Sequence, residues 1–264
     1  MTEARALGLD LVYERFDFNQ MPDGPAALPK VLRQVRDAGY LGVNITFPVK
    51  QAVLPLLDSY SSEVAELGAC NTVQLQGGRA TGHNTDWFGF ARAFERGLPG
   101  AGLDHVVLLG AGGGASAVAY ALLKMGARRI AVQARNPDRA ASFVRRFNGL
   151  AGKPRLSVVA SLKDELAGAQ GVVNCTPVGM AGHAGSPLTP DLLRPALWVA
   201  DLVYVPLRTE LLRMAEAAGC RILEGGGMAV FQAAEAFRIF TGLTPDTDRM
   251  LRRFEDDVRA ERAG

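Results

Sequence analysis

The sequence contains few of the residues that build disulfide frameworks or metal sites. Only three cysteines and three histidines occur among its 264 residues. Cys70, Cys175 and Cys220 are widely spaced, odd in number and form no Cys-x-x-Cys pair, so we expect reduced thiols rather than disulfides or a zinc site. The histidines have no metal-ligand spacing such as His-x-x-x-His. A metal-independent chemistry is therefore favoured.

The sequence also lacks a strong net charge and a long apolar run. Its 29 basic and 27 acidic residues nearly cancel, so no overall field would attract nucleic acid or an anionic membrane. No uninterrupted apolar run approaches the ~20 residues that span a bilayer. The first residues, MTEARALGLD, carry charges where a signal peptide has an apolar core. We expect a cytoplasmic protein that binds a small molecule and neither nucleic acid nor membrane; its oligomeric state is not indicated.

What the sequence has is a regular alternation of strand-like and helix-like segments. Hydrophobic residues make up 48% of the chain, which is enough for two modest domains. In the later part, short apolar runs alternate with helical stretches, which predicts an α/β fold with a Rossmann-type, doubly wound parallel sheet. The expected strands are residues 106–109, 130–133, 156–159, 171–175 and 197–202, and the expected helices are residues 115–125, 137–147, 228–240 and 245–262.

The first third of the chain predicts a smaller α/β domain. Strands are expected at residues 11–16 and 42–47, helices at 26–38 and 87–98, helical spacing at 49–58, and a hairpin that joins 72–76 to 80–83 around Gly77 and Gly78. The Pro-Gly stretch after residue 98 indicates a hinge. We therefore expect a substrate-binding and catalytic domain over residues 1–87 plus 228–264, and a cofactor-binding domain over residues 88–227.

A glycine-rich turn lies between an expected strand and an expected helix. It reads Gly110, Ala111, Gly112, Gly113, Gly114 and Ala115. Glycine at 110 permits a tight turn out of the strand, and glycine at 112 lets backbone N–H groups approach a pyrophosphate at the positive end of the helix. Glycines also mark ordinary turns, but the position between a strand and a helix favours a dinucleotide site.

The residues after the next strand indicate which dinucleotide binds. An NAD-selective site would present an acidic residue about twenty positions beyond the glycine turn, whereas this chain has Gln133, Ala134, Arg135 and Asn136 there. Arg135, with Arg139 one helical turn later, can hold a 2′-phosphate through charge-assisted hydrogen bonds. The alternative is that both arginines lie on a solvated helix face. We expect NADP rather than NAD.

Six short motifs follow one another along the chain. They are Asn-Ile-Thr-Phe-Pro-Val-Lys at 44–50, Gly-Ala-Cys-Asn-Thr-Val at 68–73, Gly-His-Asn-Thr-Asp-Trp-Phe-Gly at 82–89, Asn-Cys-Thr-Pro-Val-Gly-Met at 174–180, Asp-Leu-Val-Tyr at 201–204 and Gly-Met-Ala-Val-Phe-Gln-Ala at 227–233. In this order they resemble the shikimate dehydrogenase family, and the resemblance covers nearly the whole chain. Residues 134–140 also resemble the Asn-Arg-Thr-Pro-Glu-Arg-Ala stretch of members that use NADP, with Ala134 in place of its asparagine.

The resemblance implies an NADP-dependent oxidoreductase that interconverts 3-dehydroshikimate and shikimate, with Lys50 and Asp86 as the catalytic pair. The residues that it implies for substrate binding are Thr46, Asn71, Gln232 and Tyr204. The residues that it implies for cofactor binding, besides the glycine turn, are Arg135, Asn136, Arg139, Thr176 and Gly225. Similar enzymes use quinate or aminoshikimate, and the residues leave these alternatives open.

The proposed reaction suits Lys50 and Asp86. Oxidising a secondary alcohol requires a group that takes the hydroxyl proton while hydride leaves for the nicotinamide ring. Asp86 would favour the charged form of Lys50, whereas burial would favour the neutral form, and both remain open. We expect Lys50 to accept and donate the proton while Asp86 orients it. The ordinary alternatives are a solvated surface lysine and an aspartate that caps a helix.

One part of the family pattern is missing from the sequence. Members of the family open with a strand and a Ser-x-Ser or Ser-x-Thr segment that grips the substrate carboxylate, and no such segment precedes Leu11. Either the start of the sequence is truncated or the protein has abandoned ordinary shikimate turnover, and we favour truncation because Lys50, Asp86, Asn71 and Gln232 all remain. We expect the chain as given to bind cofactor but to turn over shikimate weakly or not at all. A second class of function, a non-catalytic sensor of cofactor or metabolite, is kept as an alternative.

Overall fold

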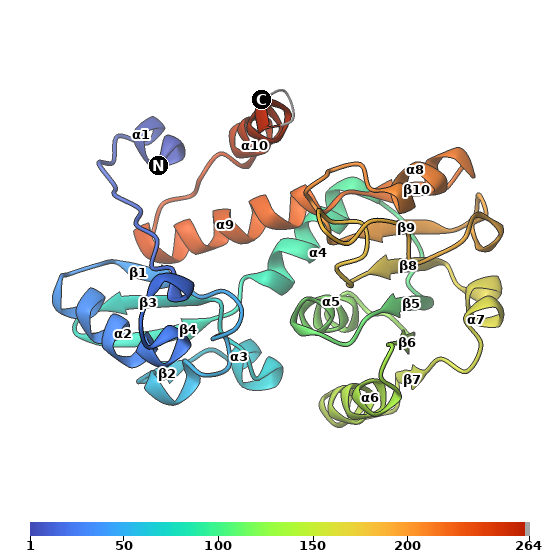
Figure 1. Ribbon diagram of the computed structural model, residues 1–264, viewed down its shortest axis with the longest axis horizontal. Helices are drawn as coiled ribbons and strands as arrows, with labels where there is room; N and C mark the ends of the chain where they lie inside the picture. Colours follow the sequence, from blue (N-terminus) through green and yellow to red (C-terminus); the bar gives the residue numbers. More distant parts are fainter. Residues whose placement is uncertain (262–264) are drawn as a thin grey trace. The chain divides into compact units, whose positions relative to one another are not determined.

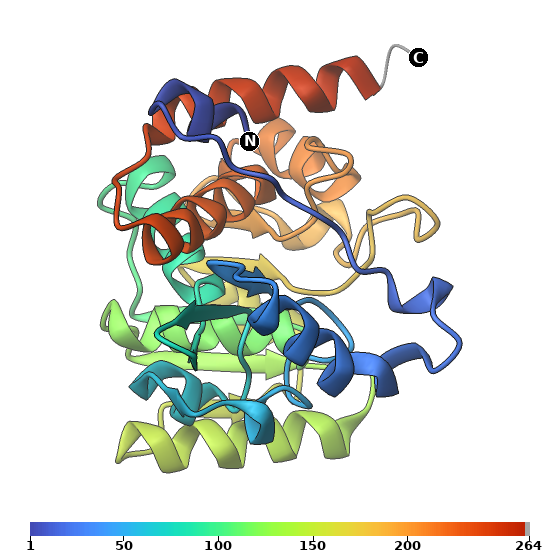
Figure 2. The same ribbon diagram turned by 90° about the vertical axis from the view of Figure 1, so that its left-hand side faces the viewer.

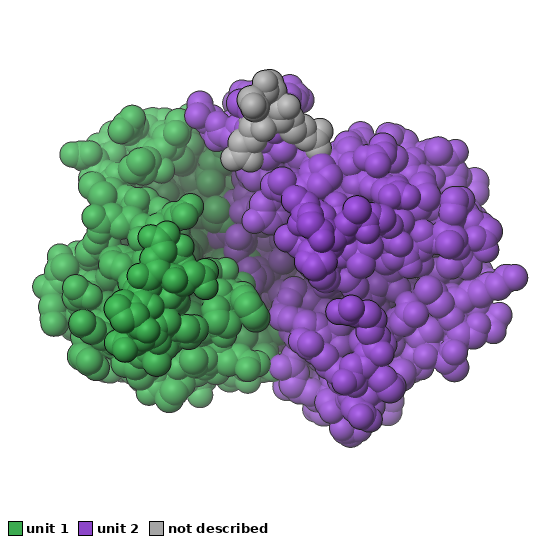
Figure 3. All heavy atoms as spheres, in the orientation of Figure 1, with its two compact units in different colours: residues 1–85, 233–250 green, residues 86–232, 251–264 purple. Residues whose placement is uncertain are grey.

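The computed structural model describes residues 1–261, which form two compact units (Figure 1, Figure 3). Unit 1 consists of residues 1–85 and 233–250, and unit 2 consists of residues 86–232 and 251–261. The sequence boundaries had been expected after residue 87 and after residue 227. Each unit has its own sheet and its own apolar core.

Unit 2 is built on a six-stranded parallel sheet. Its strands are β5 (His105–Leu109), β6 (Arg129–Gln133), β7 (Leu156–Val158), β8 (Gly171–Asn174), β9 (Trp198–Asp201) and β10 (Arg221–Leu223). Their order is β10-β9-β8-β5-β6-β7, and every neighbouring pair is parallel. The direction of winding therefore reverses between β5 and β8, which confirms the doubly wound sheet. Ligands of such sheets bind outside the carboxyl ends of the strands at this reversal.

Helices cover both faces of this sheet (Figure 1). On one face lie α4 (Asp86–Gly97), α5 (Gly113–Lys124) and α6 (Pro137–Ala151), and on the other lie α7 (Leu162–Gly168), the 3-10 helix η4 (Pro190–Leu192) and α8 (Glu210–Ala217). Leu166 of α7 and Leu211 of α8 belong to one buried cluster with Val107 and Val199 of the strands. Because both faces are covered, the strands are nearly continuous apolar runs, and the sequence reveals them for that reason.

Unit 1 is built on a four-stranded mixed sheet. Its strands are β1 (Gly42–Asn44), β2 (Ser59–Tyr60), β3 (Thr72–Gln76) and β4 (Arg79–His83), in the order β1-β3-β4-β2. β3 pairs antiparallel with both β1 and β4, whereas β2 is parallel to β4. The hairpin of β3 and β4 confirms the prediction, and Gly77 and Gly78 have φ angles of +57° and +75° at its turn. Two-residue turns of this type require positive φ, which glycine adopts without strain.

Short helices complete unit 1. They are α1 (Thr2–Ala6), η1 (Phe18–Gln20), η2 (Gly24–Ala27), α2 (Leu28–Asp37), η3 (Leu54–Leu56) and α3 (Ser62–Leu67). α2 buries Leu28, Val31, Leu32 and Val35, whose spacing of three and four places one apolar face toward the core of the unit. Two long helices, α9 (Gly225–Thr241) and α10 (Thr247–Glu261), contain residues of both units.

Glu3 connects α1 to the beginning of α10 within unit 1. Its Oε1 accepts a hydrogen bond of 2.8 Å from the backbone N–H of Asp246, and the Arg249 guanidinium donates to both carboxylate oxygens at 2.7 Å. Glu3 is only 7% exposed. The hydrogen bond from Arg249 holds the pKa of Glu3 below its usual value. The ion pair therefore joins segments that lie more than two hundred positions apart in the sequence.

The strand predicted at residues 11–16 is wrong. These residues are extended but form no ladder with another described segment (Figure 2). Val12 and Tyr13 are 77% and 62% exposed. The Tyr13 hydroxyl donates a hydrogen bond of 3.1 Å to the side chain of Asn44, which replaces backbone pairing with β1. An apolar run forms a strand only when a partner satisfies its N–H and C=O groups.

Two further predictions in unit 1 need correction. The strand expected at 42–47 ends as β1 at Asn44, because the chain turns where Thr46 O accepts from Val49 N at 3.1 Å. The helical spacing at 49–58 produces turns and the 3-10 helix η3 instead of an α-helix. Pro55 lacks an N–H and cannot continue an α-helical ladder, so the segment closes through shorter i to i+3 bonds.

Candidate active site

The glycine turn lies at the carboxyl end of β5, in unit 2. Gly110 has φ +111°, and a Cβ atom there would lie 3.0 Å from the carbonyl oxygen of Cys175. Its N–H donates to the carbonyl of Gln133 on the neighbouring strand at 2.6 Å. Position 110 therefore requires glycine for backbone conformation and for space.

The first turn of α5 exposes its backbone. Gly112 is the N-cap residue, and Gly113 and Gly114 are exposed, whereas Ala115 is completely buried. A Cβ atom on Gly112 would meet only the Arg139 guanidinium, at 3.8 Å, and one on Gly113 would meet nothing within 4 Å. The fold itself therefore leaves room above these N–H groups, which are the unpaired donors at the positive end of a helix. This arrangement fits the pyrophosphate of a dinucleotide.

Two exposed arginines follow β6 on the same side of the sheet. Asn136 caps α6, because its Oδ1 accepts from the backbone N–H of Arg139 at 3.1 Å. The Arg139 Nε donates to the carbonyl of Ala111 at 3.2 Å, which brings its guanidinium to the glycine turn. Arg135 is exposed immediately before the cap. The structure thus gathers Arg139 and the glycine turn, and leaves Arg135 in solvent.

The segment after β8 packs against the glycine turn. Thr176 donates through its backbone N–H and its hydroxyl to the Asn174 Oδ1, at 3.0 and 2.6 Å. Its methyl carbon lies 3.4 Å from the position of a Cβ on Gly110. Thr176 is therefore held beside the turn at the point where the winding of the sheet reverses.

Asp201 is a buried acid that the sequence analysis did not single out as a site residue. It ends β9, directly opposite Asn174 in the register, and is 2% exposed. Burial raises its pKa to about 6. An acid at the end of an apolar strand was visible in the Asp-Leu-Val-Tyr motif, but its partners were not.

Two more expected residues of unit 2 lie beyond β9. Gly225 begins α9, and a Cβ there would approach the carbonyl oxygen of Leu202 to 2.6 Å, so the helix starts tightly against the exit of the strand. Tyr204 is 47% exposed, and its ring packs against Phe254 with centroids 6.1 Å apart. Close packing against Leu202 therefore explains the glycine at 225 without any ligand. About half of the Tyr204 side-chain surface is exposed to solvent and could contact one.

Unit 1 contains Lys50, Thr46 and Asn71. Thr46 is exposed and Lys50 is partly buried after the turn at Pro48. The Lys50 carbonyl accepts from the backbone N–H of Cys70 at 2.9 Å, which places the lysine backbone beside the segment that carries Asn71.

Asn71 is the centre of a buried polar cluster. It is 3% exposed, its Oδ1 accepts from the Thr85 N–H at 2.7 Å, and its Nδ2 donates to the Thr85 hydroxyl at 3.0 Å. The Thr72 hydroxyl adds a bond to the Asn71 Oδ1 at 3.0 Å and accepts from the Asn44 Nδ2 at 3.3 Å. Asn44, Thr72 and Thr85 were all within the motifs but were not identified as members of the cluster.

Asp86 and Gln232 belong to unit 2. Asp86 is the first residue of α4 and is 9% exposed. Gln232 lies on α9, and its backbone N would be 2.8 Å from a Cβ on Gly89, so α4 and α9 meet at a glycine. Close helix packing explains this glycine of the 82–89 motif.

Residues 1–261 contain no group of three or more His, Cys, Asp or Glu side chains that could hold a metal ion. Among the same residues, no helix has both the length and the apolar character needed to cross a membrane. None of the three cysteines forms a disulfide.

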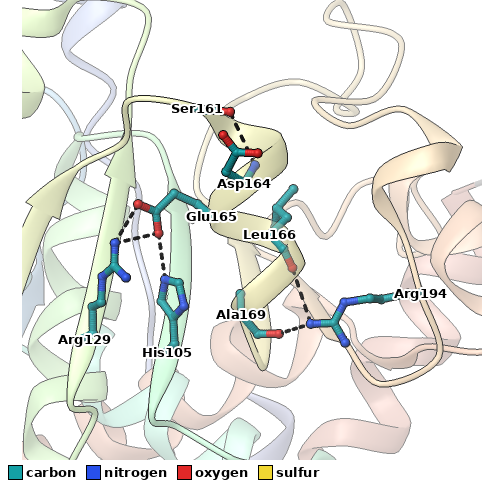
Figure 4. A network of polar contacts seen from close by, with 8 residues as sticks. All are labelled: His105, Arg129, Ser161, Asp164, Glu165, Leu166, Ala169 and Arg194. Carbon is teal, nitrogen blue, oxygen red and sulfur yellow. Dashed lines mark hydrogen bonds and ion pairs between the residues drawn. The ribbon is translucent and has the colours of Figure 1, made fainter.

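The other end of the sheet has a separate polar network (Figure 4). Glu165 of α7 pairs with His105 at 2.9 Å and Arg129 at 2.6 Å, the first residues of β5 and β6. Arg194 donates to the carbonyls of Leu166 and Ala169 at the end of α7. These contacts lie at the amino ends of the strands, away from the glycine turn, and hold α7 in place.

Known proteins are similar to this chain in sequence and in fold. The sequence is 50% identical over 251 residues to the shikimate dehydrogenase (NADP(+)) of Streptomyces avermitilis, covering 94% of this chain and 86% of the relative. The chain belongs to the shikimate dehydrogenase family. Residues 1–73 match the shikimate dehydrogenase substrate binding domain, and residues 225–253 match the shikimate 5'-dehydrogenase C-terminal domain. The resemblance read from the motifs is confirmed.

Solved structures of the family have the same fold. The quinate dehydrogenase of Corynebacterium glutamicum, solved in complex with NAD, has a TM-score of 0.93 and 44% identity, covering 97% of this chain and 92% of that one. The shikimate 5-dehydrogenase of Thermus thermophilus, solved with NADP(H) and shikimate, has a TM-score of 0.84 and 37% identity, covering 96% and 91%. The α/β fold with a Rossmann-type domain and a second, smaller domain is confirmed.

Proposed function

We propose that this chain is an NADP-dependent shikimate dehydrogenase that interconverts 3-dehydroshikimate and shikimate. The observation that carries the proposal is the glycine turn, where the first N–H groups of α5 are exposed and Arg139 reaches the Ala111 carbonyl. The relative from Streptomyces avermitilis bears the same activity in its name. A bound nicotinamide ring would take up the hydrogen and electron pair that the alcohol carbon loses.

In the proposal, Arg135 and Arg139 hold the 2′-phosphate of NADP. Both follow β6 and are exposed, and Asn136 fixes the start of α6 between them. A guanidinium fork gains strong hydrogen bonds from a phosphate, which NAD does not offer at this position. NADP should therefore bind more tightly than NAD.

The cofactor proposal is tested by replacing each arginine with alanine. Arg135→Ala and Arg139→Ala should each raise the KM for NADP roughly tenfold, the equivalent of a lost charged hydrogen bond, and leave the KM for NAD nearly unchanged. Arg145→Ala is the matched control, because Arg145 is also an exposed arginine of α6 but bonds only the Ser142 hydroxyl. Equal effects on NADP and NAD would contradict the assignment.

Lys50 is proposed to take the hydroxyl proton from shikimate and to return it to 3-dehydroshikimate, with Asp86 orienting the amine. The local hydrogen bonds support this pairing. Cys70 N–H binds the Lys50 carbonyl, the next residue is Asn71, and Asn71 Oδ1 binds the N–H of Thr85, which precedes Asp86.

Asn71, Thr46 and Gln232 are proposed to bind the hydroxyl groups of the substrate, and Tyr204 is proposed to contact it. In the same proposal, Thr176 and Gly225 line the cofactor, and residues 1–87 plus 228–264 form the substrate half of the molecule. Amides and hydroxyls suit a polyol, because they donate and accept hydrogen bonds without a fixed charge.

The role of Lys50 is tested by Lys50→Ala. The variant should lose at least a hundredfold in kcat, because general acid–base catalysis contributes roughly that much, and should bind NADPH like the unaltered chain. Lys30→Ala is the control, since Lys30 is an exposed lysine of unit 1 on α2. Retained turnover in Lys50→Ala would exclude Lys50 as the proton carrier.

Quinate oxidation is the second candidate, because the Corynebacterium glutamicum structure with a TM-score of 0.93 is a quinate dehydrogenase with NAD. Initial rates with shikimate or quinate, each with NADP or NAD, separate the two. A kcat/KM that is highest for shikimate with NADP supports the proposal. The highest value for quinate with NAD would overturn it, and binding without turnover of either acid would favour the sensor.

A further inference from the structure

A buried polar network joins the carboxyl ends of β8 and β9 in unit 2. At its centre are Asn174 and Asp201, which are paired in the strand register and are 0% and 2% exposed. The proposed reaction uses neither side chain. Buried polar groups are costly unless every one is paired, and a fully paired network fixes the segments that it joins.

The Asp201 carboxylate gathers three segments. Its Oδ1 accepts from the Asn174 Nδ2 at 2.9 Å and from the backbone N–H of Val203 at 3.0 Å. Its Oδ2 accepts from the hydroxyl of Thr209 at 2.8 Å, and Thr209 is the N-cap of α8. The ends of β8 and β9 and the beginning of α8 therefore share one buried carboxylate.

Asn174 links the Asp201 carboxylate to the loop that follows β8. Its Oδ1 accepts two bonds from Thr176, and its Nδ2 donates to the Val178 carbonyl at 3.0 Å as well as to Asp201. All four hydrogen-bonding positions of the amide are occupied. Because the Nδ2 must face an acceptor, the Asp201 carboxylate determines which way the amide points, and with it the conformation of residues 174–178.

That loop is in contact with the glycine turn. A Cβ atom on Gly110 would lie 3.0 Å from the Cys175 carbonyl oxygen and 3.4 Å from the Thr176 methyl. A shift of the loop by a few tenths of an ångström would change the surface on which a dinucleotide lies.

We propose that Asp201 is a positioning residue for the cofactor, whose carboxylate, through Asn174, holds residues 174–178 against the glycine turn and so sets the affinity for the nicotinamide dinucleotide. The inference rests on the proposed function, because it assumes that a dinucleotide binds at this turn. Asp201 itself contacts no ligand in this scheme.

The charge of Asp201 supplies a way to test it. The groups that face the carboxylate are Asn174 and Cys175 at the end of β8, the Val203 N–H and Thr209 of α8. Of these only Cys175 titrates, and burial together with Asp201 raises the pKa of its thiol, so the thiol stays neutral. Burial raises the pKa of Asp201 to about 6. Protonation below that pH removes the charge-assisted bonds and should loosen the loop.

The experiment measures NADPH affinity by fluorescence titration between pH 5 and pH 8 for three proteins: the unaltered chain, Asp201→Asn and Glu165→Gln. Glu165→Gln is the matched control, because it also neutralises a hydrogen-bonded acid of unit 2 that is partly buried, but at the amino ends of the strands (Figure 4). The 2′-phosphate of the ligand itself titrates near pH 6. The decisive quantity is therefore the difference in slope between variant and unaltered chain.

Asp201→Asn should bind NADPH about tenfold more weakly at pH 7.5, the effect of one charged hydrogen bond. Its affinity should lose the part of the pH dependence that comes from Asp201 and should meet that of the unaltered chain near pH 5. Glu165→Gln should match the unaltered chain throughout. In turnover, the KM for NADP should rise while the KM for shikimate stays constant.

Unchanged affinity and slope in Asp201→Asn, or an equal loss in Glu165→Gln, would overturn the inference while the proposed function stands. If the unaltered chain binds neither NADPH nor NADH, the proposed function fails and the inference with it. If Asp201→Asn does not fold, NADH binding to the unaltered chain decides the question, because NADH has no 2′-phosphate. Its affinity should then fall as the pH drops through about 6, and a flat profile would contradict the role of Asp201.

Discussion

The substitution Gly112→Ala, which adds one methyl group, should weaken NADPH binding without changing the stability of the fold. Gly112 has φ −97° and ψ −167°, which any residue adopts, and a Cβ there would meet only the Arg139 guanidinium at 3.8 Å. Gly112→Ala should therefore change the free energy of unfolding by less than about 0.5 kcal/mol, as surface substitutions do. The methyl group would, however, occupy the space through which a pyrophosphate approaches the α5 N–H groups.

The binding loss follows from those N–H groups. A hydrogen bond to a charged group contributes about 1.5–3 kcal/mol, so loss of one or two should weaken NADPH binding by at least tenfold. The neighbouring Gly110→Ala should behave in the opposite way. Its φ of +111° and the 3.0 Å approach to the Cys175 carbonyl should cost roughly 1–3 kcal/mol of stability before any ligand is added.

Gly149→Ala provides the control. Gly149 lies in α6 with nothing within 4 Å of an added Cβ, so alanine should stabilise the helix by up to about 1 kcal/mol and leave binding unchanged. Urea denaturation and NADPH fluorescence titration measure both quantities for all three variants. If Gly112→Ala folds normally and binds NADPH as tightly as the unaltered chain, the pyrophosphate does not lie on this turn.

Three other predictions concern stability. Because Arg249 lowers the pKa of Glu3 from 4.5, this pair stabilises the chain above that pH and the effect is lost as the pH falls through the folded pKa. Glu3→Gln should thus lower the Tm by several degrees at pH 7, and this difference should shrink as the pH falls below 4.5. A Tm difference that does not change with pH would refute the pairing. Asp201 has the opposite sign: its pKa is raised from 3.8 to about 6, so relative to Asp201→Asn the unaltered chain should gain at most about 3 kcal/mol as the pH falls from 7 to 4 in urea titrations, and a loss would contradict its burial. Asn71→Ala leaves the N–H of Thr85 without its acceptor and should lower the free energy of unfolding by about 2 kcal/mol. A Tm equal to that of the unaltered chain would contradict this prediction.

The sequence revealed unit 2 better than unit 1, and the reason is burial. β5, β6, β8 and β9 are covered on both faces and appear as apolar runs, whatever their neighbours are. The segment at 11–16 has a similar run of residues, but a strand needs a partner edge, and that information lies elsewhere in the chain. The short helices α7 and α8 and the edge strand β10 were not identified, because helices of seven or eight residues and a strand of three carry too little periodicity.

Residues whose own side-chain chemistry suits the reaction could be identified from the sequence. Residues whose role depends on a hydrogen-bond partner far away in the chain could not. Lys50, Asp86 and the glycine turn stand in motifs whose residue types suit the reaction. Thr85 and Asp201 stand in such motifs too, but their importance comes from partners fourteen and twenty-seven positions away, Asn71 and Asn174.

The two buried asparagines show a common principle of construction. Asn71 directly precedes β3 in unit 1 and Asn174 ends β8 in unit 2. Both are at most 3% exposed, and each uses its side-chain amide to fix another segment through a threonine. An amide can donate and accept at once, so one residue fixes a loop from both sides. An aspartate at either place would lose the N–H donor and leave its acceptor partner unpaired, at 174 it would also repel Asp201, and alanine would leave N–H groups without acceptors.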